Sequence, residues 1–287
     1  MSELNWFITG SSRGLGKSLV RAAAEAGHRV IATARTPGTI EAHGDRVIPL
    51  ALDVTDPAAA RAAVAAALDR VGRIDVVVNN AGQGFFGAFE EMTAEQFDAQ
   101  VAINFTGVVN VTRAVLPVLR RQRSGHIIQV SSVGGRIGAP GLSAYQASKF
   151  AVEGLSEVLW HELKPLGIKV TIVEPGGFRT DWAGSSMAWA DPIDDYNAVR
   201  AFRESVAKRA GGEPGDPDRG ARAIVELATM ADPPLRQPLG TDSYTYLKLA
   251  YESNLAELER AKAHAVATDF PGSAAPDLGK LFDRRES

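Results

Sequence analysis

Residues 7–18 read FITGSSRGLGKS, an apolar run that passes through three glycines into a helical pattern. The run predicts a buried strand, and the pattern from about Gly14 to Ala26 predicts the helix that follows it. Glycines between such elements permit a tight turn and let backbone N–H groups approach a phosphate at the positive end of the helix. The spacing of Gly10, Gly14 and Gly16 therefore predicts a phosphate-binding turn, with a purely structural turn as the alternative when the motif is taken alone.

Further apolar runs follow, separated by helical patterns. They read HRVIATAR at 28–35, RVIPLALDV at 46–54, IDVVVNNAG at 74–82, GHIIQVSS at 125–132 and IKVTIVEPGG at 168–177. Near-continuous Val and Ile runs indicate strands covered on both faces, and the helices between them favour right-handed crossovers. The sequence therefore predicts an α/β fold, a doubly wound parallel sheet of the Rossmann type with helices on both faces, in a single domain.

The remaining segments carry weaker patterns. Residues 94–121 predict two helices, and residues 180–215 predict a mobile loop with short helices. The stretch RQPLGTDS at 236–243 predicts a short strand, and a last helix is expected from about Ser243 to Ala265, followed by coil.

The composition is that of an ordinary globular chain. It has 287 residues, of which 45% are hydrophobic and 23% charged, and its net charge is −3. Such a chain can bury a large core without a metal or a disulfide. We expect residues 1–242 to form a dinucleotide-binding and catalytic domain, and residues 243–287 to add a C-terminal helix and tail to the same domain.

Several classes of protein are disfavoured. Cysteine is absent, which excludes disulfides, thiolate catalysis and cysteine-ligated zinc, and the five histidines show no metal-ligand spacing. The small net charge favours neither nucleic acid nor an anionic membrane as a partner. The N-terminus does not have the pattern of a signal peptide, and no stretch approaches the roughly 20 apolar residues of a membrane span. A cytoplasmic protein without a metal is therefore expected.

The end of the second expected strand indicates the cofactor. Folds that bind NAD often place an acidic residue there, which accepts a hydrogen bond from the ribose. Here the stretch is IATARTPG, with Arg35 in that region, and Arg13 adds a positive charge within the glycine turn. A guanidinium can bind a 2′-phosphate that a carboxylate would repel. We therefore predict NADP(H) rather than NAD(H), the alternative being two solvated surface arginines.

A phenol and an ammonium lie one helical turn apart in SAYQASKFAVEGLSEVLWHEL, residues 143–163. Tyr145 and Lys149, at i and i+4, share a face of the expected helix. A nearby ammonium favours the phenolate, so Lys149 is expected to lower the pKa of Tyr145 and let it exchange a proton with a carbonyl oxygen. Ser132, at the end of an expected strand, could orient that oxygen. An ordinary surface contact is the alternative for the Tyr–Lys pair alone.

Taken in order, these motifs resemble the short-chain dehydrogenase/reductase family, in the subgroup with a Thr-Gly-x-x-x-Gly-x-Gly turn. The matching pieces are TGSSRGLG at 9–16, DV at 53–54, NNAG at 79–82, Asn104 in VAINFTG, VSS at 130–132, YQASK at 145–149 and PGGFRT at 175–180. They cover most of the first 180 residues, and the remainder matches only loosely.

The resemblance implies specific roles. The implied catalytic residues are Asn104, which would hold a water of a proton relay, Ser132, Tyr145 and Lys149. The implied cofactor-binding residues are Gly10, Ser12, Arg13, Gly14, Leu15, Gly16, Arg35, Asp53, Val54, Asn80, Ala81, Gly82, Tyr145, Lys149, Pro175, Gly176, Phe178 and Thr180. No metal is implied. The family commonly assembles through the helices around residues 101–119 and 150–163, so a homodimer or homotetramer is expected.

The substrate is indicated less directly. Two loops at the expected ligand end of the sheet offer Phe85, Phe86, Phe178, Trp182, Met187 and Trp189. They predict an apolar pocket for a hydrophobic ketone or secondary alcohol, although these side chains could instead cover the core. Because Arg136 and Arg179 lie in or near these segments, the sequence does not exclude an acidic substrate. The alternative functions are an epimerase or dehydratase of the same family and a non-catalytic NADP(H)-binding sensor.

Overall fold

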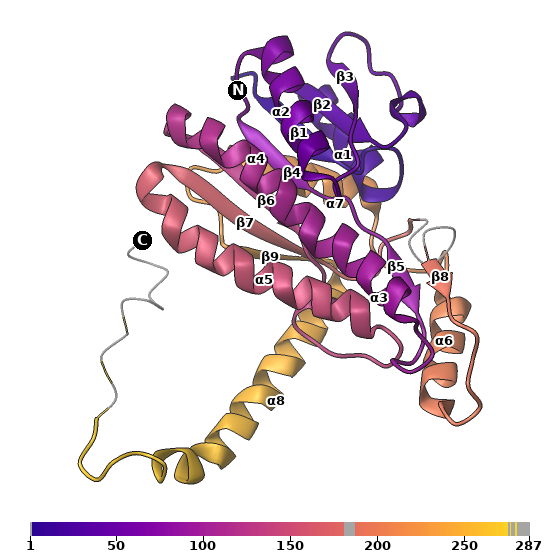
Figure 1. The fold of residues 1–287 in the computed structure, drawn as a ribbon, viewed down its shortest axis with the longest axis vertical. Coiled ribbons are helices and arrows are strands. Elements are labelled where there is room, and N and C mark those ends of the chain that lie inside the picture. The colour runs from indigo at the N-terminus through magenta and orange to yellow at the C-terminus, as the bar shows by residue number, and fades with distance from the viewer. Residues whose placement is uncertain (1, 181–186, 275, 277–278, 280–287) are drawn as a thin grey trace. The chain divides into compact units, whose positions relative to one another are not determined.

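The computed structural model describes residues 2–180, 187–274, 276 and 279. Its centre is a seven-stranded parallel sheet in the order β3-β2-β1-β4-β6-β7-β9 (Figure 1). The strands are β1 (Asn5–Thr9), β2 (Arg29–Ala34), β3 (Val47–Ala51), β4 (Val76–Asn79), β6 (Gly125–Val130), β7 (Ile168–Pro175) and β9 (Arg236–Leu239). This confirms the predicted parallel sheet, and the short strand expected near residue 236 is β9.

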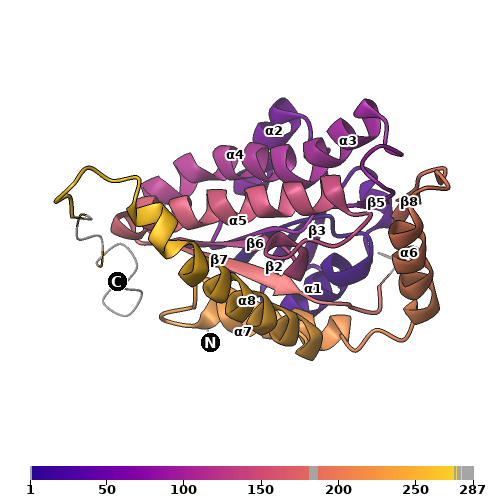
Figure 2. The same cartoon turned by 90° about the horizontal axis from the view of Figure 1, so that it is seen from below.

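Helices cover both faces of this sheet (Figure 2). One face packs on α1 (Gly14–Glu25) and α7 (Pro217–Thr229), and the other on α2 (Pro57–Val71), α4 (Gly107–Gln122) and α5 (Ser143–Leu163). Successive residues of a strand point to opposite faces, so Trp6 and Ile8 enter the first layer while Phe7 enters the second. All three are fully buried, which explains why the strands read as continuous apolar runs.

The predicted pair of helices at 94–121 is a single helical run. α3 (Ala94–Val101) passes through a π-helical turn (Ala102–Thr106) into α4, without a break. By length and composition the run Ala94–Gln122 could cross a membrane, which corrects the expectation that no stretch approaches such a span. Its apolar side chains Val111, Val115 and Leu119 are fully buried against the sheet, so core packing accounts for this composition.

The region expected to be a loop with short helices contains two further elements. β8 (Met187–Trp189) pairs in parallel with β5 (Gly84–Phe86) to form a small second sheet, and α6 (Asn197–Arg209) follows. Strands of three residues are too short to leave a pattern in the sequence. Trp182 lies outside the described residues.

The chain divides into two compact units, Met1–Leu247 and Lys248–Ser287. The first contains the sheets and the opening turns of α8 (Thr241–Val266), which begins two residues before the predicted start. The second continues α8, where Lys248 and Glu252 form an ion pair one turn apart. The predicted assignment of residues 243–287 to the first domain stays a prediction.

Candidate active site

A cavity of about 910 Å³ opens at the carboxyl ends of the parallel strands. Every residue that the sequence assigned to cofactor binding lines this cavity, from the glycine turn to Thr180. Ser132, Tyr145 and Lys149 line it as well, whereas Asn104 does not. The fold therefore brings together segments that are more than a hundred residues apart, in a cavity of the size that small-molecule sites have.

The glycine turn is held against the end of β4. Gly10 adopts a φ of +68°, in the left-handed region, and a Cβ on Gly16 would clash with the carbonyl oxygen of Gly10. The Asn80 side chain donates to the carbonyl oxygens of Thr9 and Gly10, at 3.0 and 3.1 Å. These contacts let the first helix start close to the strand ends, as phosphate binding at its N-terminus requires.

Thr9 is a site residue that the sequence analysis did not single out. Its hydroxyl accepts from the backbone N–H groups of Asn80 and Ala81, both at 3.0 Å. One threonine thus joins the glycine turn to the segment after β4. The signal was available, because Thr9 opens the matched TGSSRGLG motif, but its partners are more than 70 residues away in the chain.

Two arginines line the cavity near the end of β2. They are Arg13 and Arg35, and Thr36 and Thr39 line the cavity as well. Asp53, at the end of the neighbouring strand, accepts from the backbone N–H and hydroxyl of Thr55, at 2.9 and 2.7 Å. These bonds, assisted by the charge of Arg35, hold the pKa of Asp53 below its ordinary value, so its carboxylate is ionised and already engaged.

Tyr145, Ser132 and Lys149 form the centre of the site. The Ser132 hydroxyl is hydrogen-bonded to the Tyr145 phenol and also accepts from the N–H of Gly134, at 3.0 Å. The Lys149 ammonium lies 5.8 Å from the centre of the Tyr145 ring and donates to the carbonyl oxygen of Val130, at 2.7 Å. All three side chains are buried.

Burial decides the protonation of this group. It raises the pKa of Tyr145 to about 12, against the opposing hydrogen bond with Ser132, and lowers the pKa of Lys149 to about 8, against the opposing charge of Glu153. The prediction of a lowered pKa for Tyr145 is wrong in this structure, because desolvation of the phenolate outweighs the hydrogen bond with Ser132. At neutral pH the tyrosine therefore carries its proton and can donate it.

Asn104 lies in the π-helical turn, fully buried behind the cavity wall. Its amide donates to the carbonyl oxygen of Gln83 and accepts from the N–H of Gln83, both at 2.9 Å. A Cβ on Gly82 would lie 3.2 Å from the Asn104 oxygen and 3.9 Å from the Lys149 nitrogen. Asn104 thus lies beside Lys149, with only a glycine between them.

The apolar wall differs from the prediction. Phe86, Met187 and Trp189 pack in a cluster around Tyr145 without lining the cavity, and Phe85 packs in a separate cluster. Phe178 lines the cavity. The apolar residues that line the cavity include instead Ile137, Ala139, Leu142, Phe202 and Val206, of which Ala139, Leu142 and Phe202 also pack in the cluster of Tyr145. Phe202 and Val206 belong to α6, which the sequence analysis expected to be a loop with short helices.

Arg136 and Arg179, the two arginines that could have bound an acidic substrate, bind other groups of the protein. The Arg136 guanidinium lies 3.4 Å from a Glu174 oxygen, and Arg179 donates to the carbonyl oxygen of Glu213, at 2.8 Å. Neither lines the cavity. Within the described residues, no group of three or more His, Asp or Glu side chains is placed to hold a metal ion.

Asp242 is a second residue that the sequence analysis missed. It lines the cavity, its carboxylate accepts from the N–H of Gly177 at 2.7 Å, and a Cβ on Gly176 would clash with it. The neighbouring Ser243 donates to the carbonyl oxygen of Glu174, also at 2.7 Å. The first turn of α8 therefore fixes the segment after β7, and a pair of glycines there makes room for it.

The comparison with known proteins agrees with this arrangement. A family profile described as short chain dehydrogenase matches residues 5–191. The oxidoreductase BOA17 of Botryotinia fuckeliana is 49% identical over 92% of this chain and 98% of its own. The 3-ketodihydrosphingosine reductase of Bacteroides thetaiotaomicron is 39% identical over 81% of this chain and 86% of its own. The short-chain dehydrogenase structure from Streptomyces avermitilis superposes with a TM-score of 0.88, at 38% identity, over 94% of this chain and all of its own.

Solved structures of this fold contain both kinds of nicotinamide cofactor. A metagenomic short-chain oxidoreductase in complex with NADP has a TM-score of 0.67 at 28% identity, over 83% of this chain and 97% of its own. The 3-ketoacyl-(acyl-carrier-protein) reductase of Brucella melitensis in complex with NADH has the same TM-score and identity, over 79% of this chain and 91% of its own. With the family profile and the relatives at this level of identity, the chain belongs to the short-chain dehydrogenase family and is an oxidoreductase.

Proposed function

We propose that the protein interconverts a hydrophobic ketone and the corresponding secondary alcohol, with NADP(H) as cofactor and Tyr145 as general acid and base. The observation that carries the proposal is the buried group of Ser132, Tyr145 and Lys149, which faces a cavity lined by the glycine turn. A protonated phenol, a hydroxyl and a cation in one water-poor site are what protonation of a carbonyl oxygen needs.

The chain's own residues account for the proton transfer. NADPH, when bound, would supply the hydride to the carbonyl carbon. Ser132 would hold the carbonyl oxygen by a hydrogen bond, and Tyr145 would donate its proton to that oxygen as negative charge develops there. The Lys149 ammonium would stabilise the phenolate that remains, and oxidation of the alcohol would run through the same groups in reverse.

Three features support NADP(H) over NAD(H). Arg13 and Arg35 line the cavity, the end of β2 carries no acid, and the carboxylate of Asp53 is already bound to Thr55. A 2′-phosphate would therefore meet two guanidinium groups, which bind phosphate oxygens well. The glycine turn and Asn80 fit the diphosphate and ribose of either cofactor.

The cavity wall supports a hydrophobic substrate. Ile137, Leu142, Phe202 and Val206 line the cavity, while Arg136 and Arg179 are bound to other groups. The name of the 3-ketodihydrosphingosine reductase describes reduction of a ketone, which agrees with this class of substrate.

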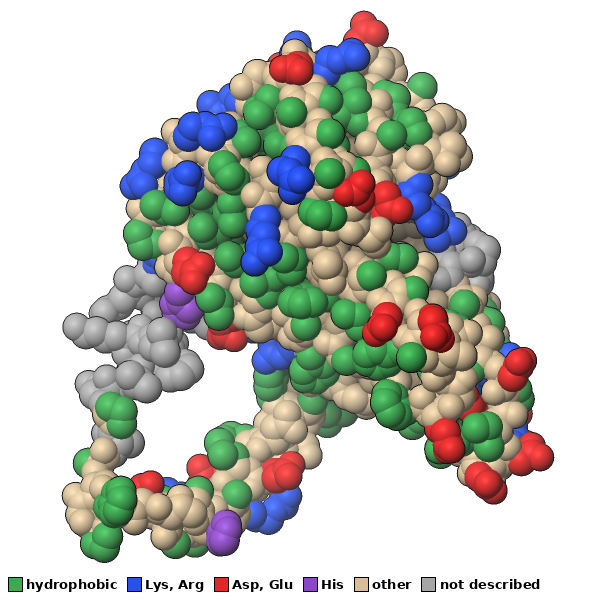
Figure 3. Space-filling model, viewed as in Figure 1, with side chains coloured by type: hydrophobic (Ala, Val, Ile, Leu, Met, Phe, Trp, Pro, Cys, Tyr) green, Lys and Arg blue, Asp and Glu red, His purple; other side chains and the backbone are tan. Residues whose placement is uncertain are grey.

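We include a homo-oligomer in the proposal. On α5, Phe150 and Val158 are 47% and 52% exposed although they lie on a helix that packs on the core. Figure 3 shows hydrophobic side chains among basic ones on the face formed by α4 and α5. Burial of this face against a second copy would remove the apolar area from water.

The test is a panel of ketones assayed with NADPH and NADH, for the wild-type protein and for Tyr145→Phe. We expect reduction of bulky apolar ketones with a preference for NADPH, and a loss of about 10²–10⁴ in kcat on substitution. Tyr196→Phe is the matched control, because Tyr196 contacts Glu90 at the surface and does not line the cavity. Wild-type turnover by Tyr145→Phe would overturn the catalytic assignment, and equal efficiency with NADH would overturn the cofactor preference.

A further inference from the structure

Two buried glutamates and two partly buried arginines lie behind the catalytic group, and we call these four side chains the buried charge network. They are Glu153 of α5, Arg136 in the turn after Ser132, Glu174 of β7 and Arg236 of β9. The side chains of Glu153 and Glu174 are only 5% and 2% exposed. Each comes from a different segment, so the fold has gathered them from positions up to 100 residues apart.

Glu153 is the centre of this network. One of its oxygens lies 2.9 Å from the Arg236 guanidinium and 3.9 Å from that of Arg136. Arg136 reaches on to Glu174, at 3.4 Å. Burial of charges costs several kcal/mol per ion, and apolar side chains in their place are often as stabilising or more so. Stability alone therefore gives little reason for ionic groups at these positions.

The network touches the catalytic residues at two points. Glu153 follows Lys149 by one helical turn on the same face of α5. Gly135, in the turn that Ser132 opens, packs on both, since a Cβ there would lie 3.0 Å from Glu153 Cγ and 3.2 Å from the Lys149 carbonyl oxygen. The network therefore joins the segment that carries Ser132 to the helix that carries Tyr145 and Lys149.

The titratable and charged groups around Lys149 come from four elements. Tyr145, Glu153 and Glu157 share its helix, and Arg136, Glu174 and Arg236 face Glu153 from the adjoining turn and strands. Burial lowers the pKa of Lys149 and the charge of Glu153 opposes this effect. Burial and the charge of Glu153 raise the pKa of Glu174 to about 7, so near neutrality this second carboxyl is only partly ionised. Glu153, held between two guanidinium groups, is the carboxylate whose charge acts on Lys149.

We propose that Glu153 is a positioning residue, which balances the Lys149 ammonium and, through Arg136, fastens the Ser132 turn to the catalytic helix. The proposal rests on the proposed function, because it assigns Glu153 a part in keeping Lys149 charged for catalysis. Without the carboxylate, the catalytic pair should lose its proton at lower pH, since a negative charge that disfavours deprotonation is gone.

The test is the pH profile of kcat for ketone reduction in Glu153→Gln. The decline of kcat at alkaline pH should begin roughly one pH unit lower than in the wild type, as expected for the removal of one partly screened charge nearby. Glu153→Asp, which keeps the charge, should restore the wild-type profile. Glu157→Gln is the matched control, because Glu157 pairs with the same Arg236 at 3.0 Å but lies a further turn from Lys149 and is 39% exposed. Its profile should match the wild type.

A direct titration of Lys149 and a second set of variants complete the test. The Lys149 ammonium can be titrated by NMR in protein with 15N-labelled lysine, assigned with Lys149→Met, which gives the pKa without turnover. If Glu153→Gln does not fold, Arg236→Leu is compared with the double variant Glu153→Met and Arg236→Leu, so that only the Glu153 charge differs between the two proteins. An unchanged Lys149 pKa in Glu153→Gln, the same Lys149 pKa in that second pair of proteins, or an equal shift in Glu157→Gln would overturn the proposal. Failure of the proposed function would show separately, as wild-type turnover that survives Tyr145→Phe.

Discussion

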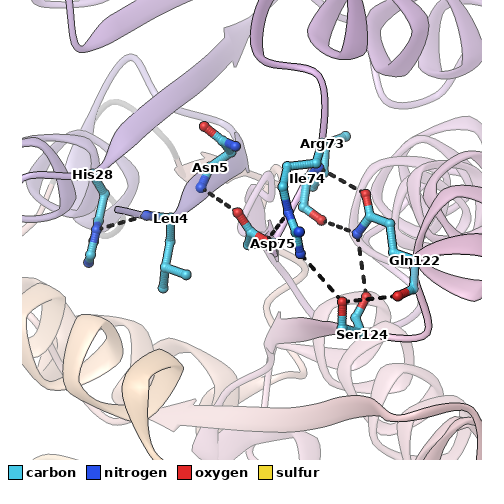
Figure 4. A network of polar contacts seen from close by, with 8 residues as sticks. All are labelled: Leu4, Asn5, His28, Arg73, Ile74, Asp75, Gln122 and Ser124. Atoms are coloured by element: carbon cyan, nitrogen blue, oxygen red, sulfur yellow. Dashed lines mark hydrogen bonds and ion pairs between the residues drawn. The ribbon is translucent and has the colours of Figure 1, made fainter. Parts of the chain in front are cut away.

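The two ends of the same sheet use polar side chains in different ways. At the carboxyl end, Lys149 and Glu174 are buried ionisable groups, and burial lowers the pKa of the first to about 8 and raises that of the second to about 7. At the amino end, polar side chains pair with one another and with the backbone (Figure 4). Polar groups arranged to meet a ligand bear a desolvation cost, whereas groups that satisfy one another contribute to stability.

Asp75 and Gln122 show such pairing at the amino end. The Asp75 carboxylate accepts from the N–H of Asn5 at 2.9 Å and from Arg73 at 2.7 Å. The Gln122 amide both donates to the carbonyl oxygen of Ile74, at 2.7 Å, and accepts from its N–H, at 3.2 Å. These bonds join β1, β4 and the end of α4 at a rim that lies away from the cavity. The comparison therefore predicts that substitutions at the two ends separate activity from stability.

The largest effect is expected for Lys149→Met. Loss of the cation should reduce kcat about a thousandfold, because the phenolate formed in the reaction loses its stabilising charge. Stability should rise by up to about 3 kcal/mol at pH 7, because the unfolded chain holds the lysine proton more tightly than a native site with a pKa of about 8. Kinetics and urea unfolding of the same preparation measure both quantities. A variant less stable than the wild type would contradict the idea that the site bears this cost.

Asp75→Ala should have the opposite outcome. The substitution leaves the N–H of Asn5 and the guanidinium of Arg73 without their acceptor, and we expect a loss of about 2–3 kcal/mol in the free energy of unfolding. Because Asp75 lies at the far end of the sheet, kcat at a temperature where the protein stays folded should not change. A fall in kcat without a fall in stability would show that the two ends are coupled.

The smallest effect concerns pH and His126, near the start of β6. Burial lowers its pKa to about 3, and Nε2 lies 2.9 Å from the Thr171 hydroxyl. Below about pH 6.5 the His126 side chain is protonated in the unfolded chain but not in the native state. The free energy of unfolding should therefore fall by about 2 kcal/mol from pH 7.5 to pH 5 because of this residue. His126→Gln should remove that part of the acid sensitivity. Unfolding midpoints of both proteins at the two pH values measure it, and parallel losses would exclude His126 as the cause.

Much of the site could be predicted because its signals are local. The turn from Gly10 to Gly16 and the pair Tyr145–Lys149 depend on spacing within one strand–helix junction or one helix, and the structure places them together in the cavity. The apolar wall could not be predicted in the same way. Phe202 and Val206 reach the cavity from α6, whose weak pattern gave no reason to place it beside Tyr145.

The sequence by itself determined the alternation of buried strands and helices, the phosphate-binding turn and the phenol–ammonium pair, since each follows from residue types at short, fixed separations. Only the tertiary structure decided the protonation of that pair, because a pKa depends on how completely the surrounding chain excludes water. It also decided the partners of Glu153 and the contact of Asp242 with Gly177, which join residues 17 to 83 positions apart. Contacts of that kind leave no periodic trace in a single sequence, since any strand order would have been compatible with the same local patterns.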